Sequence, residues 1–115
     1  MNSTNLRTII PLAGKKKVQP SDVLYLKADV NYTEVHLNDG EIVIVSKTLK
    51  ELEKRFCDHN FFRTHKSFMV NMKYVTGFRV NEEMTVNVQD EHKVSLSRRR
   101  KDDFLKMVRT SRMVA

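Results

Sequence analysis

A tight turn between two alternating segments constrains the fold of this chain more than any other feature. Asn38, Asp39 and Gly40 stand together, and asparagine and glycine tolerate the positive φ angles that a hairpin turn requires. Apolar and polar residues alternate over 33–37 before the turn, and an apolar run fills 42–45 after it. Alternation of period two is typical of a strand with one face in water. The pattern therefore predicts an antiparallel hairpin over residues 33–45.

Strand-like segments recur along most of the chain. The further predicted strands cover about residues 7–12, 23–26, 61 onward, 75–80, 84–88 and 93–97. A turn of glycine and three lysines at 14–17 follows the first of them, and a polar turn at 81–83 joins two others. The expected class is therefore mainly β (α+β).

Two segments have helical rather than strand periodicity. Thr48 and Glu51 form a capping box, in which each side chain satisfies a backbone donor of the other residue. Leu49, Leu52 and Phe56 then repeat at helical spacing, so a short helix with one buried stripe is predicted up to the polar cluster at 58–60. A second helix is predicted near the C-terminus on Phe104, Leu105 and Val108, with Ser97 as a candidate cap.

The length of 115 residues predicts one domain that can bury a core without disulfides or a structural metal. Within it we expect an N-terminal strand and basic turn at 1–17, the main domain at 18–110 and a short tail at 111–115. No apolar window is long enough for a transmembrane helix, and the N-terminus does not resemble a signal peptide. Because there is a single cysteine, Cys57, we expect a reducing, cytoplasmic location.

Positive charge is concentrated in two places. Arg63 and Lys66 alternate with apolar residues in the block Phe61–Asn71, which contains no acidic residue, and four consecutive cations occupy 98–101. Residues 98–112 carry seven Lys or Arg against two Asp, which accounts for five of the seven net positive charges. A localised cationic surface attracts anions, and nucleic acid is the leading candidate. A solubilising basic tail is the plainer alternative.

The residues do not indicate catalysis, a metal or a cofactor. Most acidic residues lie in predicted turns, where solvation explains them, and no nucleophile stands beside a recognisable base. Three glycines leave no room for a phosphate-binding loop. Cys57 and His59 lack a second pair of ligands at metal-binding spacing. We therefore expect no enzyme activity.

Taken in order, the motifs resemble the LytTR family of DNA-binding domains, which are effector modules of many bacterial response regulators. The matching segments are Asp22-Val-Leu-Tyr-Leu, Asn31-Tyr32 with the Asp39-Gly40 hairpin, Leu49-Lys-Glu-Leu52, Phe62-Arg-Thr-His-Lys-Ser-Phe-Met-Val-Asn71 and Ser97-Arg98-Arg99. The resemblance implies an elongated, antiparallel β-sandwich-like fold with two short helices. It also implies that loops, rather than a helix, enter successive major grooves of double-stranded DNA.

Carried over by position, the family's base-reading elements fall on Asn31 and Thr33, on Lys66 and on Arg98. Arg98 is the strongest of these, since a guanidinium matches guanine O6 and N7. Lys66 stands where family members carry Asn or Arg. As a point charge, its ammonium group can reach either guanine acceptors or a phosphate. The expected phosphate contacts, some of which would instead hold the loop, are Arg63, His65, Ser67, Arg99, Arg100 and Lys101.

The resemblance also implies a mode of assembly. One small module covers few base pairs, so two copies are expected on paired direct repeats. Response regulators of this family usually carry an N-terminal receiver domain, for which 115 residues leave no room; the chain would be a stand-alone regulator or an excised effector domain. Two rival functions remain: a non-specific or RNA-binding basic β domain, and a protein-interaction module whose cationic tail docks an acidic partner.

Overall fold

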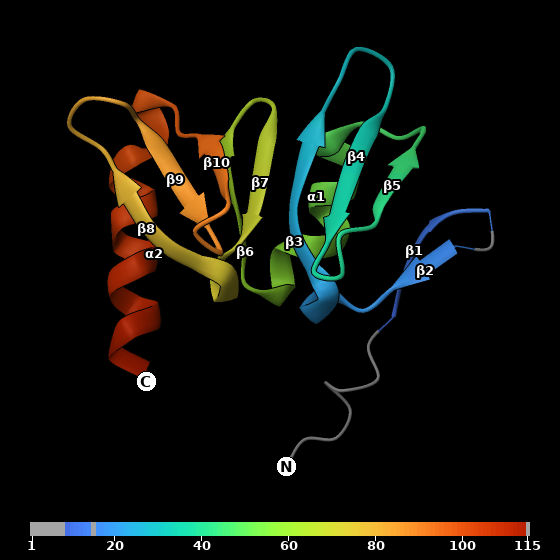
Figure 1. Cartoon of the computed structure of the whole chain (residues 1–115), viewed down its shortest axis with the longest axis horizontal. Coiled ribbons are helices and arrows are strands. Elements are labelled where there is room, and N and C mark those ends of the chain that lie inside the picture. The colour runs from blue at the N-terminus through green and yellow to red at the C-terminus, as the bar shows by residue number, and fades with distance from the viewer. Residues whose placement is uncertain (1–8, 15, 115) are drawn as a thin grey trace.

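A computed structural model of the chain describes residues 9–14 and 16–114 (Figure 1). The strands are β1 (Ile10–Ala13), β2 (Lys16–Val18), β3 (Val23–Ala28), β4 (Thr33–Leu37), β5 (Ile42–Val45), β6 (Phe61–His65), β7 (Phe68–Asn71), β8 (Val75–Arg79), β9 (Thr85–Val88) and β10 (His92–Ser95). The α-helices are α1 (Leu49–Phe56) and α2 (Lys101–Val114). Short 3-10 turns include η3 (Cys57–His59) and η5 (Arg98–Arg100).

The strands form three antiparallel sheets. A five-stranded sheet has the order β5-β4-β3-β7-β6, a three-stranded sheet has the order β10-β9-β8, and β1 pairs with β2. The central strand β3 pairs with β4 on one side and with β7 on the other. This arrangement, with two helices, confirms the predicted mainly β class.

The central strands of the five-stranded sheet contribute to two separate cores, whereas Ile42 and Ile44 of the edge strand β5 are exposed. On one face Leu26, Val35 and Met69 pack with α1 and with the β1–β2 hairpin. On the other face Leu24 and Val70 belong to a core that includes the three-stranded sheet and α2. The two helices therefore pack in different cores, and in Figure 1 α2 lies at the left edge of the molecule while α1 lies behind β3 and β4.

The 38–40 turn and the capping box form as predicted. Gly40 has φ +94°, its N–H donates to the carbonyl of Leu37 at 3.1 Å, and the hairpin joins β4 to β5. At the start of α1, Glu51 N–H donates to Thr48 Oγ1 at 3.1 Å and Thr48 N–H donates to Glu51 Oε1 at 2.9 Å. Both elements are determined by a few adjacent residues, so the local sequence is sufficient to predict them.

The Phe61–Asn71 block is a hairpin of two strands. β6 and β7 pair with Phe61 opposite Asn71, and the register shifts between Arg63 and His65. This irregularity places Thr64 in the interior, fully buried. Phe61 and Val70 are buried, while Phe62 and Phe68 are half-buried against the second core. The expected strand pattern is therefore confirmed, and the chain reverses at Lys66 and Ser67.

Asn71 has a structural role. Its Nδ2 donates to the carbonyl oxygens of Pro20 and Val23, at 3.3 and 2.9 Å, and its Oδ1 accepts from Lys73 N–H at 3.0 Å. The side chain thus fixes the entry to β3 and the exit from β7.

Two local predictions need correction. The first strand begins at Ile10 and the chain is again extended from Lys16, so the basic turn is shorter than predicted; the predicted Arg7 and Thr8 lie outside the described residues. Ser97 precedes η5, but its side chain makes no cap bond and Oγ is buried without a partner. Its backbone N–H donates instead to the Thr64 carbonyl at 2.8 Å, which ties η5 to β6.

Candidate nucleic-acid interface

Three segments that are distant in sequence lie along one edge of the molecule. They are the loop at 29–32 between β3 and β4, the Lys66-Ser67 turn between β6 and β7, and η5 (Figure 1). We call them together the loop edge. β3, β6 and β10 end at this edge, and β4, β7 and α2 begin near it. The strands and the helix therefore hold the three segments on the same side of the molecule.

The 29–32 loop is closed by its own hydrogen bonds. Asp29 N–H donates to the Tyr32 carbonyl at 2.7 Å, and Val30 N–H donates to Asp29 Oδ1 at 2.7 Å. Hydrogen bonds from Val30 N–H and from the Tyr32 hydroxyl hold the pKa of the Asp29 carboxyl below its ordinary value, and the bond to Asp29 raises the pKa of Tyr32. Val30 and Asn31 stay exposed at the tip.

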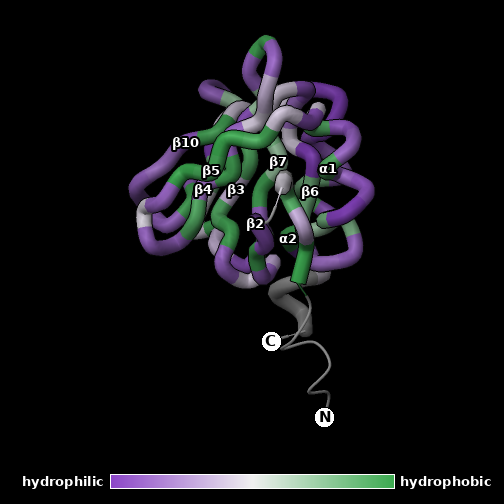
Figure 2. Tube along the Cα trace, turned by 90° about the vertical axis from the view of Figure 1, so that its right-hand side faces the viewer, coloured by the Kyte–Doolittle hydropathy of each residue, from purple (hydrophilic) through white to green (hydrophobic). Residues whose placement is uncertain are grey.

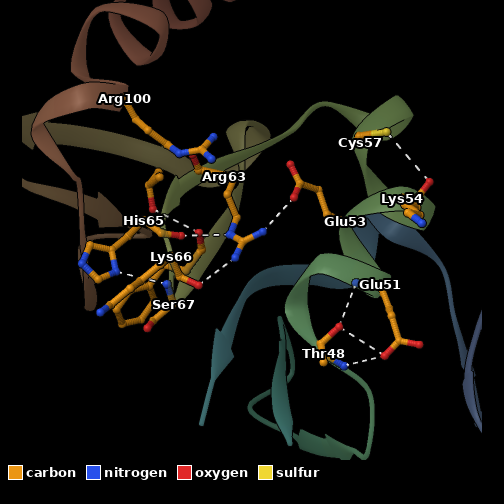
Figure 3. Close-up of polar contacts among 12 residues, drawn as sticks. Thr48, Glu51, Glu53, Lys54, Cys57, Arg63, His65, Lys66, Ser67 and Arg100 are labelled. Atoms are coloured by element: carbon orange, nitrogen blue, oxygen red, sulfur yellow. Dashed lines mark hydrogen bonds and ion pairs between the residues drawn. The ribbon is translucent and has the colours of Figure 1, made fainter. Parts of the chain in front are cut away.

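Arg63 braces the neighbouring turn (Figure 3). Its Nε donates to the His65 carbonyl at 2.9 Å, its Nη2 donates to the Lys66 carbonyl at 2.7 Å, and its Nη1 pairs with Glu53 Oε1 of α1 at 2.7 Å. All three guanidinium nitrogens are thus engaged within the protein. These contacts favour the expected alternative, in which Arg63 holds the loop, over a phosphate contact.

His65 and Ser67 complete the turn. Ser67 N–H donates to His65 Nδ1 at 3.1 Å, and the Ser67 carbonyl accepts from Ala28 N–H at 2.8 Å. Partial burial, together with the positive charges of Lys66 and Arg63, lowers the pKa of His65 below 6.5. The neutral ring that accepts at Nδ1 carries its proton on Nε2, which leaves one donor for an external acceptor.

Lys66 separates two hollows of the loop edge. The first, about 460 Å³, is lined by residues of the 29–33 segment, by Lys47 and Lys50 beside the start of α1, and by Arg63 and Lys66. The second, about 420 Å³, is lined by Arg63, His65, Lys66, Ser97, Arg99 and Arg100. Lys66 itself is exposed. The two hollows join the three segments into a continuous cationic surface.

The cations after β10 differ in their exposure. Arg98 and Arg99 are exposed, whereas Arg100 and Lys101 are half-buried. Arg100 Nη1 donates to the Arg63 carbonyl at 3.3 Å, so this side chain is partly used to join η5 to β6. Arg98 and Arg99 are thus the members of this group best placed to meet an external ligand.

Thr33 lies at the first position of β4 and is fully buried, with its Oγ1 donating to the Lys47 carbonyl at 2.8 Å. A side chain without accessible surface cannot touch a base. The burial of Thr33 therefore favours a structural role over the predicted base contact. Asn31 and Thr33 were the two base contacts predicted in this segment, and of these two residues only Asn31 is exposed.

Sequence reasoning missed Lys47, Lys50 and Val30 as members of this surface. Lys47 precedes the capping box and Lys50 lies within it, and both resemble ordinary solvated residues of a helix start. Their spacing from Lys66 along the chain carries no information, because the pairing of β3 with β4 and β7 brings them together. The exposure of Val30 at the tip is a second consequence of that pairing.

The described residues provide neither a metal-ligand cluster nor a membrane-spanning helix. Among the described residues, no group of three or more His, Cys, Asp or Glu side chains is placed to hold a metal ion. Nor is any helix within residues 9–14 and 16–114 long and apolar enough to cross a membrane.

Antiparallel sheets that present a cationic edge of loops are features of a nucleic-acid-binding domain. The model of the LytTr DNA-binding domain family matches residues 14–109. The chain belongs to the LytTR family of DNA-binding domains, as the resemblance of its motifs implied.

Three known proteins illustrate the relationship. The chain is 36% identical over 73 residues to the CO-responsive transcriptional regulator RcoM of Rhodospirillum rubrum, covering 64% of this chain and 30% of that protein. It is 30% identical over 83 residues to the sensory transduction protein LytT of Bacillus subtilis, covering 70% of this chain and 34% of the relative. The chain thus spans about a third of the length of each.

A solved structure shows the same fold. The LytTr DNA-binding domain of a response regulator from Bacillus cereus superposes with a TM-score of 0.74 at 22% sequence identity, covering 89% of this chain and 97% of that one.

Proposed function

We propose that this domain binds double-stranded DNA sequence-specifically through the loop edge and thereby regulates transcription. In this proposal Asn31, Lys66 and Arg98 contact bases from three segments that enter successive major grooves. Arg99, Arg100, Lys101, His65 and Ser67 contact phosphates or position the segments that do. The observation that carries the proposal is the placement of Lys66 between two hollows that connect the 29–33 segment to η5.

The distribution of aromatic side chains argues against the RNA-binding alternative. Single-stranded recognition uses exposed aromatic rings on which bases stack. The exposed large hydrophobic residues of the described chain are instead aliphatic, namely Ile9, Val30, Ile42 and Ile44. The phenylalanines of the β6–β7 hairpin face the cores.

The binding unit on DNA is proposed to be two copies on direct repeats. Three loop segments of one small domain reach only a short stretch of duplex, whereas specificity in a genome requires more base contacts. A tandem arrangement doubles these contacts without requiring a symmetric protein interface.

Sequence selection from random duplex DNA tests the proposal. We expect an enriched motif, repeated in the same orientation when two copies bind, and an affinity for it that falls steeply with salt because cations release counterions from phosphates. Binding of all duplexes with equal affinity would indicate the non-specific alternative. Salt-sensitive binding of an acidic protein surface, without DNA binding, would indicate the protein-interaction module.

A further inference from the structure

Val30 is the most exposed large apolar side chain of the described residues. Its exposed fraction is 88%, compared with 46–54% for Ile9, Ile42 and Ile44. Single exposed apolar residues are common on protein surfaces and by themselves need no explanation. Val30 differs because it occupies the tip of a loop on the edge where the ligand is proposed to bind.

The loop presents this side chain in a fixed position. The Asp29 carboxylate accepts from Val30 N–H at 2.7 Å, and Asp29 N–H closes the loop on the Tyr32 carbonyl at 2.7 Å. A loop braced in this way loses little conformational entropy when it meets a ligand. The Asp29 carboxylate is hydrogen-bonded within the loop, whereas the Val30 side chain is exposed and can contact a partner.

The surroundings of Val30 fit a duplex better than an apolar protein groove. It lines the first hollow together with Asn31, with four cationic side chains and with the carboxylates of Asp29 and Glu51, so the apolar tip lies in a polar surface with more cations than anions. In Figure 2 the uppermost loop carries a short hydrophobic segment between hydrophilic ones along the chain. Cations around a single apolar contact match the floor of a major groove, where phosphates flank the edges of the bases.

The major groove contains one apolar group that identifies a base. Thymine projects its C5 methyl there, and small apolar side chains contact this methyl in direct readout. We infer that Val30 is a specificity-determining residue that contacts a thymine methyl next to the base contacted by Asn31. The inference rests on the proposed function and adds a base preference that none of the cationic side chains can supply.

Substitution of uracil for thymine tests the inference, because uracil lacks only the C5 methyl. Each thymine of the selected duplex is replaced in turn, and the affinities of the intact chain and of Val30→Ala are measured. For the intact chain we expect one replacement in each half-site to weaken binding about fourfold, as the loss of one buried methyl predicts. Val30→Ala should bind the thymine and uracil duplexes equally, because its shorter side chain does not reach the methyl.

Ile42→Ala provides a matched control. Ile42 is a second exposed aliphatic residue, 49% exposed on β5, and it lies at the 38–41 hairpin end of that strand, away from the loop edge. This variant should keep the full sensitivity to uracil. Since Val30 makes no core contact, its alanine variant is expected to fold as the intact chain does, which circular dichroism checks.

The outcomes separate the two proposals. A selected duplex that the intact chain binds equally well with every thymine replaced overturns the role of Val30 and leaves sequence-specific binding intact. A methyl effect that persists undiminished in Val30→Ala also overturns it. A chain that selects no sequence at all overturns both.

Discussion

The Arg63 guanidinium of β6 and the Glu53 carboxylate of α1 form an ion pair of 2.7 Å that joins the hairpin to the helix. The side chains are 14% and 35% exposed, so the pair is shielded from solvent more than a typical surface salt bridge. The same guanidinium holds the carbonyl groups of His65 and Lys66. Arg63 therefore sets the position of Lys66 relative to α1, and the cationic character of this residue serves the fold.

Replacement of Arg63 by alanine should reduce stability. It removes three charge-assisted hydrogen bonds and leaves Glu53 without its partner, so we expect a loss of roughly 1–3 kcal/mol in the free energy of unfolding. Urea denaturation measures this loss. Lys54→Ala, which alters an exposed side chain on the same helix, should change stability little. Unchanged stability combined with a reduced salt slope of DNA binding would mean that Arg63 contacts a phosphate after all.

Thr33→Val should affect stability and not base preference. The substitution keeps the shape of the side chain but leaves the buried Lys47 carbonyl without its donor, which costs about 1–3 kcal/mol. Thr33→Ser retains the hydroxyl and should lose less. Repeating the selection with Thr33→Val is expected to return the same motif as the intact chain, and a changed base preference would show that Thr33 reads a base.

Arg98 and Arg99 are predicted to respond differently to substitution. Arg98→Ala should reduce the discrimination between the selected duplex and a scrambled one by about 1–3 kcal/mol. Arg98→Lys should lose most of it too, because lysine keeps the charge but not the planar fork. Arg99→Ala should weaken both duplexes equally and reduce the salt slope by about 1. Dissociation constants at several salt concentrations measure these effects, and equal weakening by Arg98→Ala would disprove base reading.

His65 should make the hairpin less stable in acid. Its folded-state pKa lies below the ordinary 6.5, so in mildly acidic solution the unfolded chain binds a proton that the folded chain does not. Its contribution is therefore present in full above about pH 6.5 and is lost as pH falls toward the folded pKa. NMR titration of the ring measures that pKa. In His65→Gln this part of the pH dependence should disappear; if it remains, another group is responsible.

Phe104 should be the main anchor of α2. It is fully buried, and its ring lies 5.8 Å from that of Phe62 and 5.4 Å from that of Phe78, measured between centroids. Phe104→Ala should cost about 3–5 kcal/mol of stability, because it leaves a cavity between β6, β8 and the helix. The half-buried Leu105 provides the comparison, and Leu105→Ala should cost clearly less in the same thermal or urea denaturation.

Local patterns were reliable where adjacent residues determine the structure. The hairpin turn at 38–40, the capping box of Thr48 and Glu51, and the buried stripe of the first helix all agree with the prediction. Turns, caps and alternating faces depend on neighbours in sequence, and a single chain contains all of that information. Ser97 was an exception, because the bond of its backbone to Thr64 and the burial of its hydroxyl involve residues far away in the chain.

The sequence by itself determined the family, the mainly β class and the positive charge of Lys66 and the 98–101 run. Only the tertiary structure decided which polar side chains bond within the protein and which are exposed to a ligand. Arg63 and Thr33 have the same chemistry whether they bind DNA or the protein's own backbone, and the pairing of β6 with β7 and of β3 with β4 directs both inward. The same long-range pairing leaves Val30, Asn31 and Lys66 exposed on one edge, and the bond from Ser97 N–H to the Thr64 carbonyl places η5 beside them. Burial depends on contacts between distant segments and not on residue type.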